Sequence, residues 1–133
     1  MEEQFRAALL ANSGLAAIVG TRIDWGLRGQ APSIRLQVVS GVPFYTHSGR
    51  NEMTPYLVQA DCFGARFGDA KRVARAVQAA CDDLGLPHFD SCFVENERDD
   101  QDVDAASNPI HRTSLDLRLW PVSYTHLTLP TKR

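Results

Sequence analysis

The sequence predicts an α+β domain, in which one long helix and one or two short helices pack on an antiparallel sheet of about four to five strands. The first observation is a mostly apolar run, Met53 to Phe63, which suits a half-buried strand and ends at Gly64. The second is the helix period that follows, because apolar residues recur at spacings of three and four between Ala70 and Leu84. Such a helix cannot bury its apolar side alone. We therefore expect it to pack on a sheet that contains the preceding strand.

The N-terminal part predicts two short helices followed by two strands. Residues Glu2 to Ala11 carry apolar side chains at helical spacing, with acidic residues in the first turn, where the helix dipole favours them. Ser13 is expected to cap a second, shorter helix that Gly20 closes. Two strands are expected next, Thr21 to Trp25 and the alternating Ser33 to Ser40, with a glycine-containing loop between them.

The C-terminal half predicts the long helix and two further strands. The helix is expected to begin at Gly68 or Asp69 and to end near Gly85. Phe89 to Glu97 can form a fourth strand, and Ile110 to Trp120 is the most regularly alternating strand of the chain. Alternate side chains of that last strand should face opposite sides of the sheet. They are Thr113, Leu115, Leu117 and Leu119 on one side, and Ser114, Asp116 and Arg118 on the other.

Length and composition are those of an ordinary globular protein. The 133 residues are expected to form one domain, with 44% hydrophobic and 23% charged residues. No apolar run approaches the roughly 20 residues that a membrane-spanning helix needs, and the first residues do not resemble a secretion signal. We therefore expect a soluble protein that folds in the cytoplasm and has no membrane partner. The formal charge of −2 argues against general nucleic-acid binding, which normally needs a basic surplus.

The chain contains no recognisable motif for catalysis or for a cofactor. It lacks the glycine-rich phosphate loops, the HExxH zinc motif and the GxSxG nucleophile motif. Its three cysteines, Cys62, Cys81 and Cys92, lie far apart in apolar surroundings, so we expect small core residues. The sequence therefore predicts a protein that is not an enzyme, with no catalytic residue, no cofactor and no metal site.

The C-terminal segment 122–133 resembles translated sequencing adaptor. The residues from Val122 to Thr131 are the translation, in one frame, of a transposase-derived adaptor. We therefore expect a single domain over residues 1–121 and exclude the segment from it. Without Lys132 and Arg133 the chain has 12 basic and 16 acidic residues, a formal charge of −4. The alternative is a genuine final strand from Ser123 to Leu129.

The connection from Gly41 to Glu52 is the first candidate for assembly. It is longer than the roughly two to five residues that a hairpin needs, and it contains Phe44, Tyr45 and Arg50. We expect either an arm that becomes ordered against a neighbouring subunit or a mobile surface loop.

An acidic run lies between the last two expected strands. It contains Asp99, Asp100, Asp102 and Asp104. We expect a solvated, mobile loop whose clustered charge creates a negative local field. Calcium binding is not expected, because the glycine and the glutamate that an EF-hand loop requires at fixed positions are missing.

Five segments of the chain occur in an order typical of one family. They are Leu15 to Ile23, Val58 to Gly64, Asp69 to Val77, Glu95 to Asp99 and His111 to Trp120. In this order they resemble the tail completion or tail terminator proteins of long-tailed bacteriophages and gene-transfer particles, a group similar to the small head-to-tail joining proteins. The similarity extends over essentially Met1 to Trp120, and its specificity lies in the order of the segments.

The resemblance implies a structural virion protein of the tail or neck, assembled in the cytoplasm of a bacterial host. It implies a homo-oligomeric ring, usually of six copies, that terminates the tail tube. The implied partners are the tail tube protein and the head-to-tail connector or stopper protein, with viral DNA passing through the lumen. An acidic protein would repel phosphates and let the duplex slide.

Closure of such a ring needs contacts between different patches of neighbouring copies. The exposed side of the long helix is expected to meet acidic residues of the next copy, and the acidic run is expected to face the lumen. The candidate interface residues are Phe44, Tyr45, Arg50, Lys71, Arg72 and Arg75, and the candidate lumen residues are Asp99, Asp100, Asp102 and Asp104.

Two other classes of function stay open. One is a different neck component or an adaptor of a tail-like injection device. The neighbouring genes would distinguish these possibilities, because they would encode either a tail tube or a secretion apparatus. The other is an enzyme or a small-ligand-binding domain. A closed pocket converging on Cys62, Cys81 or a histidine would favour that class.

Overall fold

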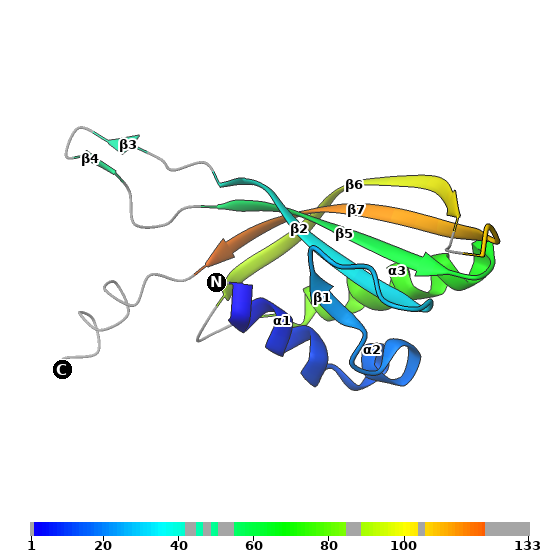
Figure 1. Ribbon diagram of the computed structural model, residues 1–133. Helices are drawn as coiled ribbons and strands as arrows, with labels where there is room; N and C mark the ends of the chain where they lie inside the picture. Colours follow the sequence, from blue (N-terminus) through cyan, green and yellow to red (C-terminus); the bar gives the residue numbers. More distant parts are fainter. Residues whose placement is uncertain are drawn as a thin grey trace.

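The helices of this protein lie together on one side of a five-stranded sheet (Figure 1). The computed structural model describes residues 2–41, 45–46, 49–50, 55–84, 89–103 and 106–121. Its helices are α1 (Glu2–Ala11), α2 (Ser13–Val19) and α3 (Phe67–Asp82). The strands of the sheet are β1 (Ile23–Trp25), β2 (Ser33–Gly41), β5 (Tyr56–Gly64), β6 (Phe89–Val103) and β7 (Pro109–Pro121), and their spatial order is β1-β2-β5-β7-β6.

The sheet is antiparallel except at one edge. β1 pairs with β2 in parallel, with Ile23 opposite Ile34, whereas every other neighbouring pair in the sheet is antiparallel. The predicted α+β class and strand number are confirmed, and the parallel pair is the departure from an antiparallel sheet. Because β1 spans only about 10 Å, the loop of residues 26–32 is long enough to return the chain to the end from which β1 started.

The long helix packs its small apolar side on the sheet, as its period predicted. The buried residues of α3 are Ala70, Val73, Ala74, Val77, Ala80 and Cys81. The helix begins at Phe67, slightly before the expected start. Gly64 permits the close approach of helix and strand, because a Cβ there would lie 2.4 Å from the backbone nitrogen of Ala70. Any larger residue would push the start of α3 away from β5.

The two short helices complete the covered face. Phe5, Leu9, Leu15 and Val19 are fully buried. Asn12, not Ser13, caps α2, since its side-chain oxygen accepts a hydrogen bond from the backbone nitrogen of Leu15 at 3.0 Å. The expected cap was therefore wrong by one residue. Asn and Ser are about equally good caps, so sequence preference did not separate them.

Strand β7 alternates as predicted, whereas β6 differs from the prediction. Leu115, Leu117 and Leu119 are fully buried. β6 was expected to end at Glu97, but it continues to Val103 and is paired with β7 along its length. Register shifts between Phe89 and Ser91 and between Val94 and Asn96 interrupt its regular alternation. The acidic run from Asp99 to Val103 is thus part of a strand and not a loop.

Two predicted segments fall largely outside the described residues. Of the connection from Gly41 to Glu52, the structure describes β3 (Tyr45–Thr46) and β4 (Gly49–Arg50), which pair as a separate two-stranded ladder. Phe44, Asp104 and the C-terminal segment 122–133, with its alternative strand from Ser123 to Leu129, lie outside the described part. Among the helices that are described, none is long and apolar enough to cross a membrane.

Candidate assembly surfaces

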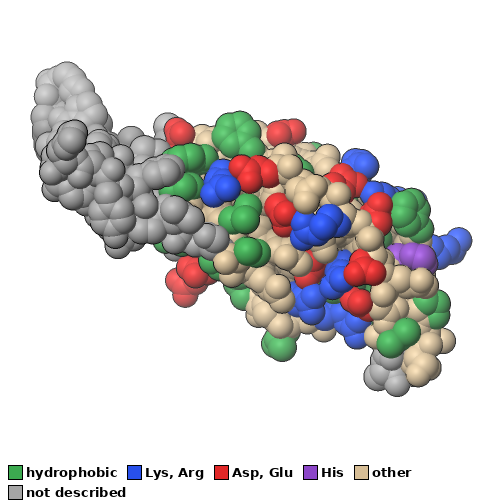
Figure 2. Space-filling view, turned by 90° about the horizontal axis from the view of Figure 1, so that it is seen from above, with side chains coloured by type: hydrophobic (Ala, Val, Ile, Leu, Met, Phe, Trp, Pro, Cys, Tyr) green, Lys and Arg blue, Asp and Glu red, His purple; other side chains and the backbone are tan. Residues whose placement is uncertain are grey.

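The face of the sheet opposite the helices carries charges of both signs. In Figure 2, which views this open face, basic and acidic side chains are interspersed over the strands. They come from alternate positions of the same strands whose other residues form the core. The charged residues of this open face that form ion pairs are Arg35, Asp61, Glu95, Arg98, Asp100, Asp102, Arg112, Asp116 and Arg118.

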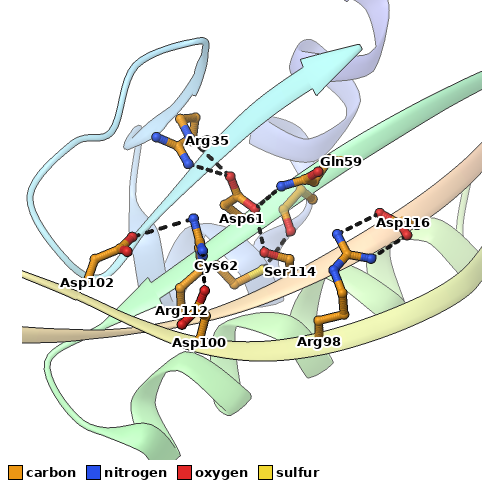
Figure 3. A network of polar contacts seen from close by, with 11 residues as sticks. Arg35, Gln59, Asp61, Cys62, Arg98, Asp100, Asp102, Arg112, Ser114 and Asp116 are labelled. Atoms are coloured by element: carbon orange, nitrogen blue, oxygen red, sulfur yellow. Dashed lines mark hydrogen bonds and ion pairs between the residues drawn. The ribbon is translucent and has the colours of Figure 1, made fainter. Parts of the chain in front are cut away.

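The buried carboxylate of Asp61 lies at the centre of the open face (Figure 3). Ser114 Oγ donates to one of its oxygens at 2.6 Å, and Gln59 Nε2 donates to the same oxygen at 2.8 Å. Arg35 donates twice to the other oxygen, at 2.7 and 3.0 Å. Burial alone would raise the pKa of Asp61, but these hydrogen bonds from Ser114, Gln59 and Arg35 outweigh it and lower the pKa. The group therefore links β2, β5 and β7 as an ionised carboxylate.

Three arginines join β6 to β7 by ion pairs across the two strands. Arg98 Nη1 lies 2.6 Å from Asp116 Oδ2, and Arg118 Nε lies 3.0 Å from Glu95 Oε2. A third arginine has two carboxylate partners, at 2.7 and 3.5 Å (Figure 3). It is Arg112, and the partners are Asp100 and Asp102. These pairs follow from the register, because oppositely charged residues on neighbouring strands lie within reach on the same face.

A second polar cluster joins α3 to β6 on the helix-covered side. Lys71 contacts both Glu97 and Asp99, the latter at 2.8 Å. Arg75 Nη1 donates to Glu97 Oε1 at 3.0 Å, and Gln78 Nε2 donates to the same oxygen at 3.2 Å. The hydrogen bonds from Arg75 and Lys71 lower the pKa of Glu97 to about 2. The hydrogen bonds to Asp99 and Glu97 raise the pKa of Lys71.

This cluster shows where the predicted interface cations lie. Lys71 and Arg75 are bonded to carboxylates of their own chain, and Arg72 pairs with Asp69 at 3.1 Å while its side chain stays 66% exposed. The acidic partner expected in a neighbouring copy is therefore present within the subunit. The side chains of Tyr45 and Arg50 are outside what the structure describes. The interface role of these residues remains a prediction.

The predicted lumen residues do not form one acidic surface. Asp99 points toward α3, where Lys71 neutralises it, while Asp100 points to the open face, where Arg112 neutralises it. The expected loop would have allowed all these carboxylates to face one way, but a strand sends successive side chains to opposite faces. Each described carboxylate of the run at positions 99, 100 and 102 has a cationic partner. The negative field of the run is correspondingly weaker than its charge count suggests.

The three thiols are core groups, as predicted. Cys62, Cys81 and Cys92 are free and buried. Burial raises the pKa of the Cys62 thiol, and the hydrogen bond with Cys92 followed by burial raises the pKa of Cys81. Because the thiolate is the nucleophile and the metal ligand, the raised pKa disfavours both roles for Cys62 and Cys81. Across the described ranges, no group of three or more His, Cys, Asp or Glu residues is arranged to hold a metal ion.

A pocket of about 440 Å³ lies where the loop 26–32 meets the turn between β6 and β7. No cysteine or histidine is among its described lining residues, so it does not favour the small-ligand alternative. Its lining includes Arg28, Gln30, Ala65, Asn108 and Ile110.

Several large apolar side chains are exposed, although no motif in the sequence identified them. Leu27, in the loop after β1, is 71% exposed, and Phe67, the first residue of α3, is 51% exposed. Phe93 is 57% exposed on β6. The available signal was that each of the first two residues stands beside an arginine: Leu27 precedes Arg28, and Phe67 follows Arg66.

Comparison with known proteins gives a family and a fold. The family described as Tail completion protein gp17 matches residues 3–120. A chain in a solved structure titled "Virion of native gene transfer agent (GTA) particle" is similar in fold, with a TM-score of 0.60 and 20% sequence identity. The match covers 86% of this chain and 89% of that chain. No curated protein matches the sequence.

Proposed function

Because this chain belongs to the tail completion protein family of bacteriophages, and is therefore a structural component of a virion tail, we propose that it terminates the tail tube as a ring of six copies. In this proposal the ring joins the tube to the head-to-tail connector, and DNA passes through its lumen. The protein has no catalytic step to perform. Its partners are further copies of itself, the tail tube protein and the connector or stopper protein.

The observation that carries the proposal is the extent of the family match. Residues 3–120 contain the described helices and main-sheet strands, except for the terminal residues Glu2 and Pro121. The role of the family therefore belongs to the whole folded unit and not to a small module within it. A gene transfer agent virion contains a chain of similar fold, which supports a place in a tail-like particle.

The charge arrangement of the open face supports the passage of DNA without tight binding. Arg98, Arg112 and Arg118 are each bonded to carboxylates of β6 or β7. DNA-binding affinity comes largely from cationic side chains that neutralise phosphates and release counterions. Cationic side chains that are already paired with carboxylates contribute less to this affinity. We propose that this face, with Asp100 and Asp102, lines the lumen, and that Asp99 does not.

Native mass spectrometry and electron microscopy test the ring. The full chain and a version ending at Pro121 should both give a closed oligomer of six with an opening wide enough for duplex DNA. Imaging of particles should place the ring between the tube and the connector. A protein that stays monomeric at every concentration, and is missing from purified tails, would exclude the proposed function.

Deletion of residues 42–51 tests the arm. We expect the shortened chain to remain a folded monomer, because β2 and β5 are paired with each other up to Gly41 and Tyr56 without that segment. It should no longer form the ring if the arm reaches a neighbouring copy. If the shortened chain still elutes as the oligomer, the segment is only a surface loop.

A further inference from the structure

Most charged side chains that the structure describes are paired within the subunit, and the exceptions fall into two groups. Arg22 and Arg28 have no described carboxylate within 4.0 Å, and Arg66 reaches Asp69 only at 4.0 Å. Arg22 instead donates to the backbone oxygen of Pro32 at 2.8 Å. The carboxylates that lack a described cation within the same distance are Glu3, Asp82, Asp83 and Asp90.

The three arginines lie together at the start of α3. Arg66 directly precedes the helix. Arg28 and Ala65 line the same pocket, so the loop 26–32 adjoins the start of α3. The hydrogen bond from Arg22 to Pro32 brings the third arginine to that loop. We call Arg22, Arg28 and Arg66 the basic end.

The four carboxylates belong to the end of α3 and to the starts of α1 and β6. These element ends lie toward the same side of the molecule, away from the start of α3 (Figure 1). The helix finishes at Asp82, and its Cys81 thiol is hydrogen-bonded to Cys92 of β6. The first residue of β6, Phe89, packs on Phe5 of α1 with ring centroids 6.0 Å apart. We call Glu3, Asp82, Asp83 and Asp90 the acidic end. A helix of 16 residues separates the two ends by about 24 Å.

The dipole of α3 makes this separation of charge unfavourable within one subunit. A helix N-terminus carries partial positive charge and its C-terminus partial negative charge. Arg66 stands at the N-terminus, and Asp82 and Asp83 stand at the C-terminus, which is the reverse of the favourable arrangement. Asp69 in the first turn offsets part of the effect at the basic end. Among the described residues, the only opposite charge within 4.0 Å of either end is Asp69, which Arg66 reaches at 4.0 Å, so each end would gain from a further one.

The basic end also presents apolar side chains suited to a protein contact. Leu27 is 71% exposed beside Arg28, and Phe67 is 51% exposed beside Arg66. Arginine and aromatic residues are enriched in protein interfaces, where they contribute much of the binding energy. A duplex DNA partner would use the arginines but not these apolar neighbours. A protein partner would use both.

We propose that the basic end of one copy docks on the acidic end of a second copy. The occupant is a second copy because the complementary charges belong to the same chain and lie at opposite ends of one helix. A contact between two different patches repeats from copy to copy and closes into a ring where the rotation allows. The charges fix orientation and register, and Leu27 and Phe67 contribute affinity. This inference rests on the proposed ring and names the surfaces that close it.

Paired charge reversals in the full-length chain test the contact. An acidic-end variant carries Asp82→Lys, Asp83→Lys and Asp90→Lys, and a basic-end variant carries Arg28→Glu and Arg66→Glu. Each alone should assemble at least tenfold more weakly than the unmodified protein, because like charges then meet at every contact. An equimolar mixture of the two should recover the oligomer, because the two variants can alternate around a ring of even number.

Three controls keep this result interpretable. Circular dichroism and thermal unfolding check that each variant is folded. The swap of Glu95→Arg with Arg118→Glu reverses a pair of the open face without changing net charge, and it should assemble normally. If the lysine variant does not fold, the milder Asp82→Asn, Asp83→Asn and Asp90→Asn variant should still weaken assembly several-fold and remove most of its salt dependence.

The outcomes separate this contact from the function proposed above. If the unmodified protein forms rings and either folded variant forms them equally well, the contact is wrong and the function stands. A mixture that stays monomeric although both variants are folded also overturns the contact. The unmodified protein and the recovered mixture could both form open filaments instead of rings. In that case the contact stands and the proposed ring is wrong.

Discussion

The two faces of the sheet are built from alternate residues of the same strands, yet they are held together by different forces. In β7, Leu115 and Leu117 face the helices and are fully buried. The alternate residues Asp116 and Arg118 face the open side and form ion pairs. Burial of one leucine contributes about 1.5 to 3 kcal/mol, whereas an exposed ion pair contributes about 0 to 1 kcal/mol. The covered face therefore supplies most of the stability. The open face fixes the register and presents the surface available to partners.

The largest expected effect of a single substitution lies on the covered face. Leu117→Ala should lower the free energy of unfolding by about 4 kcal/mol, because it removes buried apolar atoms and leaves a cavity between β7 and α3. Urea unfolding followed by circular dichroism measures the loss. A cost below about 1 kcal/mol would contradict the assignment of stability to this face.

The centre of the open face should give the next largest effect, because the Asp61 carboxylate there is fully buried. Asp61→Ala should cost about 3 kcal/mol, since it leaves Arg35 without its carboxylate and Ser114 without its acceptor. The double variant with Arg35→Ala should cost less than the sum of the two single changes. Additive costs would show that the pair does not act as a unit.

Acid should weaken the link between α3 and β6. The folded-state pKa of Glu97 is about 2, below its ordinary value of 4.5. A depressed carboxyl pKa stabilises the fold fully above the ordinary value, and this contribution is lost as the pH falls from about 4.5 toward about 2. Because the cluster is partly exposed, we expect a loss of about 1 kcal/mol. Urea unfolding at several pH values should show this component in the unmodified protein and not in Glu97→Gln.

The smallest effect is expected at the rim of the open face. Arg98→Ala removes the ion pair between Arg98 and Asp116. Because the Arg98 side chain is 45% exposed, the change should lower the free energy of unfolding by only about 0.5 kcal/mol. Raised salt should reduce even this difference. A cost near that of Leu117→Ala would mean that ion pairs of the open face stabilise the fold as much as buried leucines do.

The local sequence pattern predicted which residues of α3 and β7 form the covered face. The apolar period of α3 and the alternation of β7 each identified which side chains are buried, because burial repeats within a few residues along the chain. The order of five short segments indicated the tail completion family, which the match over residues 3–120 confirms. The same reasoning failed for the acidic run. Consecutive aspartates are typical of solvated loops, and nothing local shows that a facing strand supplies their cations.

Taken by itself, the sequence determined the α+β class, the core sides of α3 and β7, and the absence of familiar catalytic motifs. Only the tertiary structure decided that β1 is parallel to β2, that β6 extends to Val103, and that Lys71 and Arg75 are bonded within the subunit. The physical reason is sequence distance. The partners of Asp61 include Arg35, 26 residues away, and Ser114, 53 residues away, and they meet only once strand order and register are set. Periodic burial is a property of neighbours in the chain, whereas charge pairing is a property of neighbours in space.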